Sequence, residues 1–208
     1  MLSIKENIQA IRVTLPENVT LVCVSKFKPV EAIMEAYEAG ERDFGESRVQ
    51  ELCAKQAALP KDIRWHFIGH LQTNKVRQIV PFVHLIHSVD SLHLLEVINT
   101  EAARIGRKVD VLLEVHTANE ETKSGFLPEE VSDYRLQVSG FQNVRVRGLM
   151  TMATNTDDEA EIHRCFRALR GMAQEGDIVS MGMSDDYPLA IEDGATMVRI
   201  GSKIFGER

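Results

Sequence analysis

The sequence has few of the residues that bind metals, form disulfides or contact nucleic acid. Its three cysteines are an odd number without a CxxC pair, and its seven histidines lack a convincing metal-binding spacing, so we expect neither a disulfide framework nor a metal site. Cys23, Cys53 and Cys165 are expected to be reduced core residues. The 24 basic residues are outnumbered by 31 acidic ones, which gives a formal net charge of −7. This balance argues against binding to nucleic acid, which relies on a basic face.

Long apolar runs are also missing. Residues 1–6 are partly polar and acidic where a signal peptide needs an apolar stretch, and no run approaches the roughly 18 apolar residues of a membrane span. We therefore expect a cytoplasmic protein without membrane contacts. The composition is ordinary for a globular protein, with 44% hydrophobic and 26% charged residues. A chain of 208 residues can bury enough surface to fold unaided, and we expect one domain over residues 1–208.

Short apolar runs alternate with amphipathic helical segments along the chain. The clearest strand, 109–115, is apolar on both faces apart from Asp110 and Glu114, as a covered parallel sheet requires. A typical helical segment is opened by Pro29, carries apolar residues at helical spacing and ends near Gly40. We expect eight strands, at residues 19–24, 43–45, 65–68, 83–87, 109–115, 144–150, 178–181 and 196–200.

Eight strands that alternate with helices predict an α/β fold, a single (β/α)8 TIM barrel. The pattern favours this barrel over an open doubly wound sheet, which stays the alternative. The chain is short for a barrel, so its helices and loops must be trimmed. In such barrels the functional site forms at the carboxyl ends of the strands. The polar residues that follow each predicted strand are therefore the candidates for function.

Lys26 is the first of these candidates, because it follows the apolar run 21–24 at the end of the first predicted strand. A lysine that is partly desolvated at a barrel mouth more readily supplies the neutral amine that imine formation needs. We expect no other lysine at that mouth. From spacing alone, a solvated lysine that merely marks the end of a strand is the commoner explanation.

A second candidate feature follows the last two predicted strands. Gly201 and Ser202 can offer backbone N–H groups at the start of a final helix, where TIM barrels often hold phosphate. Ser184 adds a hydroxyl after the seventh strand. Simple helix capping by Ser184 and a tight turn at Gly201 would account for the same residues. Arg199, two residues before Gly201, could equally belong to a structural ion pair.

Several separate motifs, in a fixed order, resemble the pyridoxal 5′-phosphate (PLP) homeostasis protein family. The resemblance runs from about residue 19 to about residue 206. Its motifs are residues 24–26 (VSK), 65–75 (WHFIGHLQTNK), 121–125 (ETKSG), 148–153 (GLMTMA), 180–184 (SMGMS) and 198–201 (VRIG). The family is similar to the barrel domain of bacterial alanine racemase, so the resemblance implies a lone (β/α)8 barrel of that kind.

The resemblance also implies that PLP is the cofactor, held as a Schiff base on Lys26. Ser184 and the backbone of Gly201 and Ser202 would hold its phosphate. Arg199 would sit beside the pyridine nitrogen, and Met152 and His66 would line the ring pocket. The family commonly has asparagine where this chain has Ser47, and proline where it has Thr154. The implied cofactor-binding residues are Lys26, Ser47, His66, Met152, Ser184, Arg199, Gly201 and Ser202.

Two functions of different classes fit this resemblance. In the first, the protein is a monomer that binds and releases PLP, buffers it and delivers it to PLP-dependent apo-enzymes without turnover of its own. In the second, it is a PLP-dependent amino-acid racemase. A Schiff-base aldolase is a third and weaker interpretation, because Lys26 has no clear acid/base partner.

The missing second base favours the carrier. Two-base racemisation needs an acid/base group opposite the lysine, which in alanine racemase comes from an additional domain for which this chain has no room. Tyr37 and Tyr134 are expected on helix faces and Tyr187 in an outer loop, so none of them is a plausible second base. An arginine at the pyridine nitrogen keeps that nitrogen unprotonated and makes the ring a poorer electron sink. We therefore predict a non-catalytic protein without catalytic residues.

Overall fold

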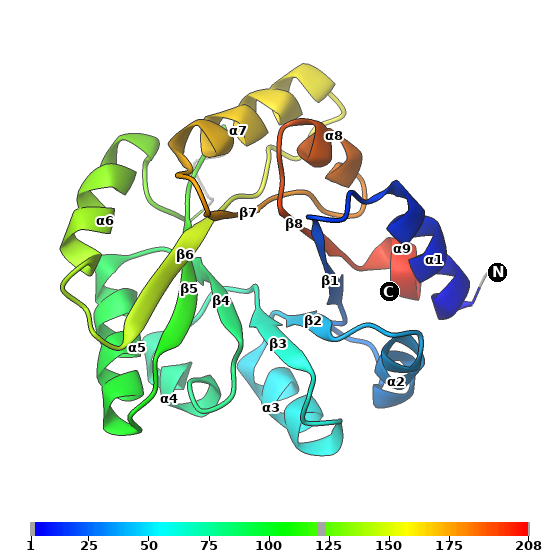
Figure 1. Ribbon diagram of the computed structural model, residues 1–208, viewed down its shortest axis with the longest axis horizontal. Helices are drawn as coiled ribbons and strands as arrows, with labels where there is room; N and C mark the ends of the chain where they lie inside the picture. The colour runs from blue at the N-terminus through cyan, green and yellow to red at the C-terminus, as the bar shows by residue number, and fades with distance from the viewer. Residues whose placement is uncertain (1–2, 120–123, 208) are drawn as a thin grey trace.

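Eight parallel strands close into a barrel in the computed structural model, which describes residues 3–119 and 124–207 (Figure 1). Each strand pairs with the next one along the chain, and β8 pairs with β1 to complete the ring. The prediction of a (β/α)8 barrel is confirmed, and the open doubly wound sheet is excluded. The strands are β1 (Thr20–Val24), β2 (Asp43–Glu46), β3 (Arg64–Phe67), β4 (Leu85–Val89), β5 (Val109–Glu114), β6 (Val144–Met150), β7 (Ile178–Ser180) and β8 (Met197–Ile200).

Helices surround the barrel and cover its outer face (Figure 1). Among the described residues, no helix is both long and apolar enough to cross a membrane. The α-helices are α1 (Ile4–Thr14), α2 (Val30–Glu38), α3 (Val49–Ala58), α4 (Val76–Ile79), α5 (Leu92–Arg104), α6 (Val131–Val138), α7 (Glu159–Met172), α8 (Tyr187–Glu192) and α9 (Ser202–Phe205). Two 3₁₀ turns, η1 (Thr73–Lys75) and η2 (Pro128–Glu130), lead into α4 and α6.

Helix α1 is an element that the sequence analysis missed. Its start carries a capping box, in which the Ser3 side chain accepts from the Glu6 backbone N–H and the Glu6 carboxylate accepts from the Ser3 backbone N–H. Ile8 and Ile11 form its buried face, and α1 packs against α2 and α9 (Figure 1). The pattern S-x-x-E before apolar residues at helical spacing was the signal that could have revealed it.

The core has two parts, one between the barrel and its helices and one inside the barrel. Successive residues of a strand point to opposite sides, so every second residue enters the interior. The interior apolar cluster is Val22, Leu85, Leu112, Met150 and Met197. Residues two positions further along each strand therefore lie one layer closer to the carboxyl end of the barrel.

Gly148 allows β6 to pass closely against β7. The pairing of β5 with β6 shifts register between Val111 and Leu112, and Gly148 has a φ of 149°. A Cβ atom at this position would lie 2.0 Å from the backbone oxygen of Ile178. Only glycine fits such an approach. After this register shift, Met150 lies in the interior apolar cluster of the barrel. Two residues later, Met152 lines a cavity at the carboxyl end.

Candidate functional site

A cavity of about 300 Å³ opens at the carboxyl end of the barrel. Its wall is built from strand ends that are distant in the sequence, including Val24 of β1 and Ile68 just after β3. All of the predicted cofactor-binding residues except His66 line it: Lys26, Ser47, Met152, Ser184, Arg199, Gly201 and Ser202. The fold thus brings together a lysine, three serines, a methionine, an arginine and a glycine from distant parts of the sequence.

Buried polar contacts fix the end of β1 immediately before Lys26. Ser25 is fully buried, and its hydroxyl donates to Glu46 Oε1 at 2.6 Å. The Lys55 ammonium donates to the Ser25 carbonyl and to Glu46 Oε1, both at 2.7 Å. Burial raises the pKa of Glu46, although the hydrogen bonds from Lys55 and Ser25 oppose this shift. Lys26 therefore leaves the strand from a rigid, fully buried anchor.

The turn after Lys26 is held in an uncommon conformation. Phe27 has a φ of 64°, which few residues other than glycine adopt. The Lys28 N–H donates to the Ser25 carbonyl at 3.0 Å, which closes a type II turn with Phe27 at its third position. The Phe27 N–H donates to Glu51 Oε1 at 2.6 Å and stabilises this geometry. The turn gives Lys26 one defined place at the cavity wall.

Lys28 is a second lysine at the barrel mouth, so the expectation that Lys26 stands there alone is wrong. It also lines the cavity, but its ammonium donates to the carbonyls of Phe205, Gly206 and Glu207 at 2.9–3.1 Å. The type II turn explains this position, because it sends the residue after Phe27 back toward the mouth. Its hydrogen bonds hold the chain after α9 at the rim of the cavity.

Ser184, Gly201 and Ser202 form the opposite side of the cavity. Ser184 is buried, with 7% of its surface exposed, and its hydroxyl oxygen accepts a hydrogen bond from the Gly201 N–H at 3.2 Å. Gly201 lies so close to β1 that a Cβ atom there would be 3.1 Å from the Val24 carbonyl oxygen. Ser202 begins α9. The result is a small group of hydroxyl and N–H donors beside a close backbone approach, which suits an anionic group.

Arg199 is a buried cation at the wall of the cavity. It is 4% exposed, and its guanidinium donates to Ser180 Oγ at 2.7 Å and to the Thr151 carbonyl at 2.9 Å. Both partners are neutral oxygens. Burial lowers the pKa of Arg199 to about 10, so the group is still charged at neutral pH. A buried charge whose two hydrogen-bond partners are both neutral favours a ligand that supplies negative charge or a lone pair.

Glu114 is a buried carboxyl that the sequence analysis did not include in the site. It ends β5, is 4% exposed, and accepts from Ser124 Oγ at 3.4 Å. Burial, assisted by the nearby Asp90 carboxylate, raises the pKa of Glu114 to about 7. It borders a small recess that also touches Met152. The signal for Glu114 in the sequence was an acidic residue at an inward position of a strand that is apolar apart from Asp110.

Glu114→Gln is expected to remove a pH dependence of stability. The pKa of Glu114 is higher in the folded protein than in the unfolded chain, so ionisation costs the folded state free energy as pH rises from about 4.5 to about 7. The free energy of unfolding of the wild type should fall by about 3 kcal/mol relative to the variant across this window. Urea unfolding at about pH 4, 6 and 8 measures it.

The control for this experiment is Glu175→Gln, at an exposed glutamate. Its free energy of unfolding should run parallel to that of the wild type at every pH. A constant difference between the wild type and Glu114→Gln would show that Glu114 titrates normally.

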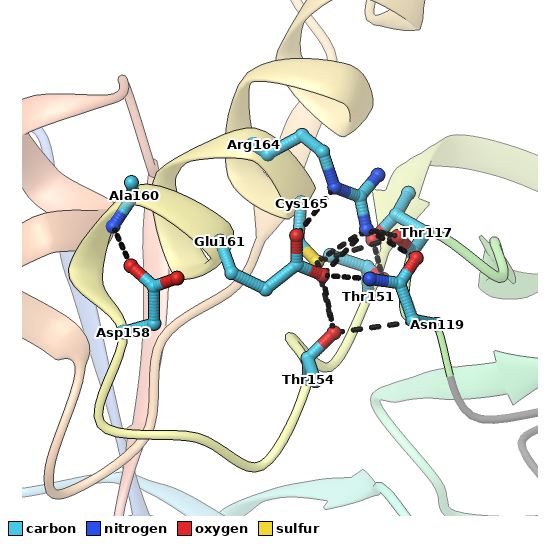
Figure 2. A network of polar contacts seen from close by, with 9 residues as sticks. All are labelled: Thr117, Asn119, Thr151, Thr154, Asp158, Ala160, Glu161, Arg164 and Cys165. Carbon is cyan, nitrogen blue, oxygen red and sulfur yellow. Dashed lines mark hydrogen bonds and ion pairs between the residues drawn. The ribbon is translucent and has the colours of Figure 1, made fainter.

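A polar network ties the loops after β5 and β6 to helix α7 (Figure 2). The Glu161 carboxylate accepts from Asn119 Nδ2 at 2.8 Å and from Thr154 Oγ1 at 2.7 Å. Arg164 donates to the same carboxylate and to the Thr117 carbonyl at 2.9 Å. The hydrogen bonds of Arg164 and Thr154 lower the pKa of Glu161 to about 2. The loop that carries Met152 to the cavity is thereby held from outside the barrel.

Comparison with known proteins identifies the family of this chain. Residues 2–208 match the family model described as alanine racemase, N-terminal domain. A pyridoxal phosphate homeostasis protein from Vibrio alginolyticus is 40% identical over 206 residues, which cover 93% of this chain and 88% of that protein. The chain belongs to the pyridoxal phosphate homeostasis protein family. The resemblance predicted from the sequence motifs is confirmed.

Solved structures show the same fold. PipY of Synechococcus elongatus without PLP has a TM-score of 0.93 and 41% identity, and the match covers 98% of this chain and all of PipY. The structure of PipY with PLP bound has a TM-score of 0.89 and 40% identity over the same shares. Alanine racemase from E. faecalis has a TM-score of 0.79 at 19% identity, covering 99% of this chain and 58% of the enzyme, which shows the shared barrel alone.

His66 is the one predicted residue of this family member that the fold does not bring to the cavity. It is 1% exposed and bonds His87 and Asp43 inside the barrel. The reason is the period of the strand: Ile68 lines the cavity, and His66 lies two residues earlier, one layer deeper. Of the family motif at 121–125, residues 121–123 lie outside the described part of the chain.

Proposed function

We propose that this protein binds PLP through Lys26 and acts in PLP homeostasis as a carrier or buffer. Bound PLP supplies an aldehyde, which condenses reversibly with an amine and releases one water. One observation carries the proposal: Lys26 and a set of anion-binding donors face the same cavity, in a relative of PipY, whose structure has been solved with PLP bound. The amine and the donors would bind the two ends of one ligand.

The residues present fit PLP in size and charge. A cavity of about 300 Å³ is at the lower end of the range for small-molecule sites. Ser184 and the N–H groups of Gly201 and Ser202 would hold the phosphate, with the Ser184 hydroxyl turning from Gly201 toward the ligand. Converging donors would offset the desolvation of a phosphate dianion. Met152 would contact the ring, and Ser47 would lie near it at the cavity wall.

Arg199 supports binding without catalysis. It would sit beside the pyridine nitrogen, where a group that is charged at neutral pH donates a hydrogen bond and leaves the nitrogen unprotonated. An unprotonated ring is a poorer electron sink, so the carbanion chemistry of amino-acid enzymes is less favoured. The two hydrogen bonds from the buried guanidinium to Ser180 and to the Thr151 carbonyl support this role, because they hold the group in one orientation.

Among the described residues that line the cavity there is neither a tyrosine nor a histidine to act as a second acid/base. Besides the proposed ligands of PLP, the titratable residues of the lining are Lys28, Asp185 and Glu207, and the Lys28 ammonium is engaged by three backbone carbonyls. Tyr187 was expected in an outer loop, but it begins α8 and is buried, with its hydroxyl 3.1 Å from Thr14 Oγ1. This contact directs it toward α1 and away from Lys26. The arrangement favours a carrier over an amino-acid racemase.

Purified protein loaded with PLP is expected to reactivate a PLP-requiring apo-enzyme and to show no turnover of amino acids. The physical reason is the combination of a reversible attachment with the missing second base. Reactivation is measured by the activity that returns to the apo-enzyme, and turnover by chiral separation after incubation with L- and D-alanine.

The controls use the same protein preparation. Protein with Lys26→Ala should reactivate the apo-enzyme no better than free PLP at equal concentration. Racemisation that depends on Lys26, on the order of 1 per second as in ordinary enzymes, would establish the racemase and reject the carrier.

A further inference from the structure

A chain of buried hydrogen bonds crosses the interior of the barrel from Arg199 to Asp43. Arg199 Nη1 lies 2.7 Å from Ser180 Oγ, which lies 3.0 Å from His87 Nδ1. His87 Nε2 lies 2.9 Å from His66 Nδ1, and His66 Nε2 lies 3.0 Å from Asp43 Oδ1. All five residues are buried. The proposed cofactor site and the opposite end of the barrel are thus joined by continuous polar contacts through the interior.

The two ends of this hydrogen-bond chain fix the direction of its first and last bonds, and the Ser180 hydroxyl proton decides the two bonds between them. A guanidinium only donates, and an ionised carboxylate only accepts. Burial opposes the ionisation of Asp43, but the hydrogen bonds from His66 and Arg64 outweigh it and hold the pKa of this carboxyl well below its usual value. His66 must therefore donate from Nε2, and with one proton on the ring its Nδ1 accepts.

The same reasoning continues through the next two residues. His87 must donate from Nε2 to His66, so its Nδ1 accepts the hydroxyl proton of Ser180, whose oxygen accepts from Arg199. Burial lowers the pKa of His87 well below its usual value, which keeps this ring neutral. If the hydrogen bonds ran in the opposite direction, the Ser180 oxygen would accept from both His87 and Arg199. The buried hydroxyl proton of Ser180 would then no longer have His87 as its acceptor. Each group accepts on the Arg199 side and donates on the Asp43 side.

We propose that His66, His87 and Ser180 are positioning residues that hold Arg199 in one orientation at the cavity through this one-way chain. The aligned dipoles present their negative ends to the guanidinium and their positive ends to the carboxylate, which stabilises both charges across the barrel. The Ser180 hydroxyl proton is committed to His87, so its oxygen is a permanent acceptor for Arg199. The effect of Arg199 on bound PLP rests on the proposed function, whereas the direction of the hydrogen bonds between Arg199 and Asp43 does not.

A metal ion is the competing interpretation of the Asp43 end. Asp43, His66 and His84 are a group of described residues whose ligand atoms lie within 4.8 Å of one another. Arg64, however, already donates to both carboxylate oxygens of Asp43, at 2.6 Å and 2.5 Å. A metal on His66 Nε2 would also move the ring proton to Nδ1 and reverse the chain. We therefore assign this end as an ion pair that terminates the hydrogen bonds.

The order of the protons is tested on cofactor-free protein with ¹⁵N-labelled histidine rings. Long-range ¹H–¹⁵N spectra are expected to show His66 and His87 as Nε2–H tautomers, with both Nδ1 atoms as acceptors. The signals are assigned by removing the exposed histidines, such as His84 and His93, one at a time. An Nδ1–H signal from either ring, or loss of the His66 Nε2–H signal on addition of zinc, would overturn the assignment.

The positioning role is tested by Ser180→Ala, with Ser88→Ala as the matched control. Both serines are buried, but the Ser88 hydroxyl donates to the Gly69 carbonyl and takes no part in the hydrogen bonds between Arg199 and Asp43. Ser180→Ala is expected to shift the absorbance maximum of bound PLP and to release PLP about tenfold faster, as for the loss of one hydrogen bond to a charged group. Ser88→Ala should change neither property.

The possible outcomes separate the two proposals. Unchanged absorbance and release rate in Ser180→Ala would reject the positioning role even where the tautomers are as assigned. Absence of PLP binding by the wild type would reject the proposed function, while the spectra of the cofactor-free protein would still decide the direction of the chain.

Discussion

Lys26→Ala is expected to abolish the borohydride-reducible adduct with PLP completely. Reduction by borohydride makes the bond between the aldehyde carbon and the lysine nitrogen permanent, so the adduct appears as one added mass per chain. Lys26 faces the same cavity as the Ser184 and Gly201 donors, and its backbone is fixed by the buried Ser25 anchor and the turn at Phe27. Mass spectrometry of reduced wild type and variant measures the result.

Lys28→Ala is the matched control, because Lys28 lines the same cavity two residues away. Its ammonium is engaged by three backbone carbonyls, so this variant is expected to form the adduct at full stoichiometry. Neither change removes core packing, although Lys28→Ala loses the hydrogen bonds to the chain after α9, so thermal unfolding of both variants checks that the barrel stays folded. An adduct of unchanged mass and stoichiometry in Lys26→Ala, but not in Lys28→Ala, would move the attachment site to Lys28.

The barrel could be predicted from the sequence because its signals are local. Apolar runs mark the strands, as in β5, and the residues after these runs mark the carboxyl end, as for Lys26 and Gly201. The capping box of α1, formed by Ser3 and Glu6, is an equally local signal. Boundaries differ by one or two residues, as for β3, which was expected at 65–68 and spans Arg64–Phe67.

The interior of the barrel could not be predicted, because it depends on layers set by the strand stagger. The sequence shows that His66 precedes a strand end but not that Ile68, two residues later, takes the place at the cavity. Nor does any local pattern connect Ser180 with His87, 93 positions apart in the chain. Contacts of this kind follow from closure of the barrel, and they decide which polar residues meet the ligand.

Ser184→Ala and Arg199→Ala are each expected to weaken PLP binding about ten- to a hundred-fold. Losing one hydrogen bond to a charged group costs about 1.5–3 kcal/mol, which corresponds to this range in affinity. Ser184 would contact the phosphate and Arg199 the opposite end of the ligand, and no hydrogen-bond partner is shared between their side chains in the described structure. Effects at independent sites add in free energy, so the double variant should bind about a hundred- to ten-thousand-fold more weakly.

The dissociation constant, from titration of the PLP absorbance or fluorescence, measures these effects. Lys26 is intact in both variants, so the reducible adduct should still form at high PLP concentration, which separates this result from that of Lys26→Ala. A double variant of the same residue types at the surface, Ser139→Ala with Arg104→Ala, should bind PLP like the wild type. Equal retention of PLP by the wild type, Ser184→Ala and Arg199→Ala would remove both residues from the proposed site.

Arg199→Lys distinguishes charge from geometry at this position. Lysine keeps the positive charge, but its single ammonium cannot reproduce a planar group whose two nitrogens reach Ser180 Oγ and the Thr151 carbonyl at once. If charge alone attracts the ligand, Arg199→Lys should bind PLP like the wild type. If the orientation set by the buried chain matters, its affinity should lie between those of the wild type and Arg199→Ala. We expect the intermediate value, because a guanidinium held by two fixed acceptors keeps its remaining donors in one direction.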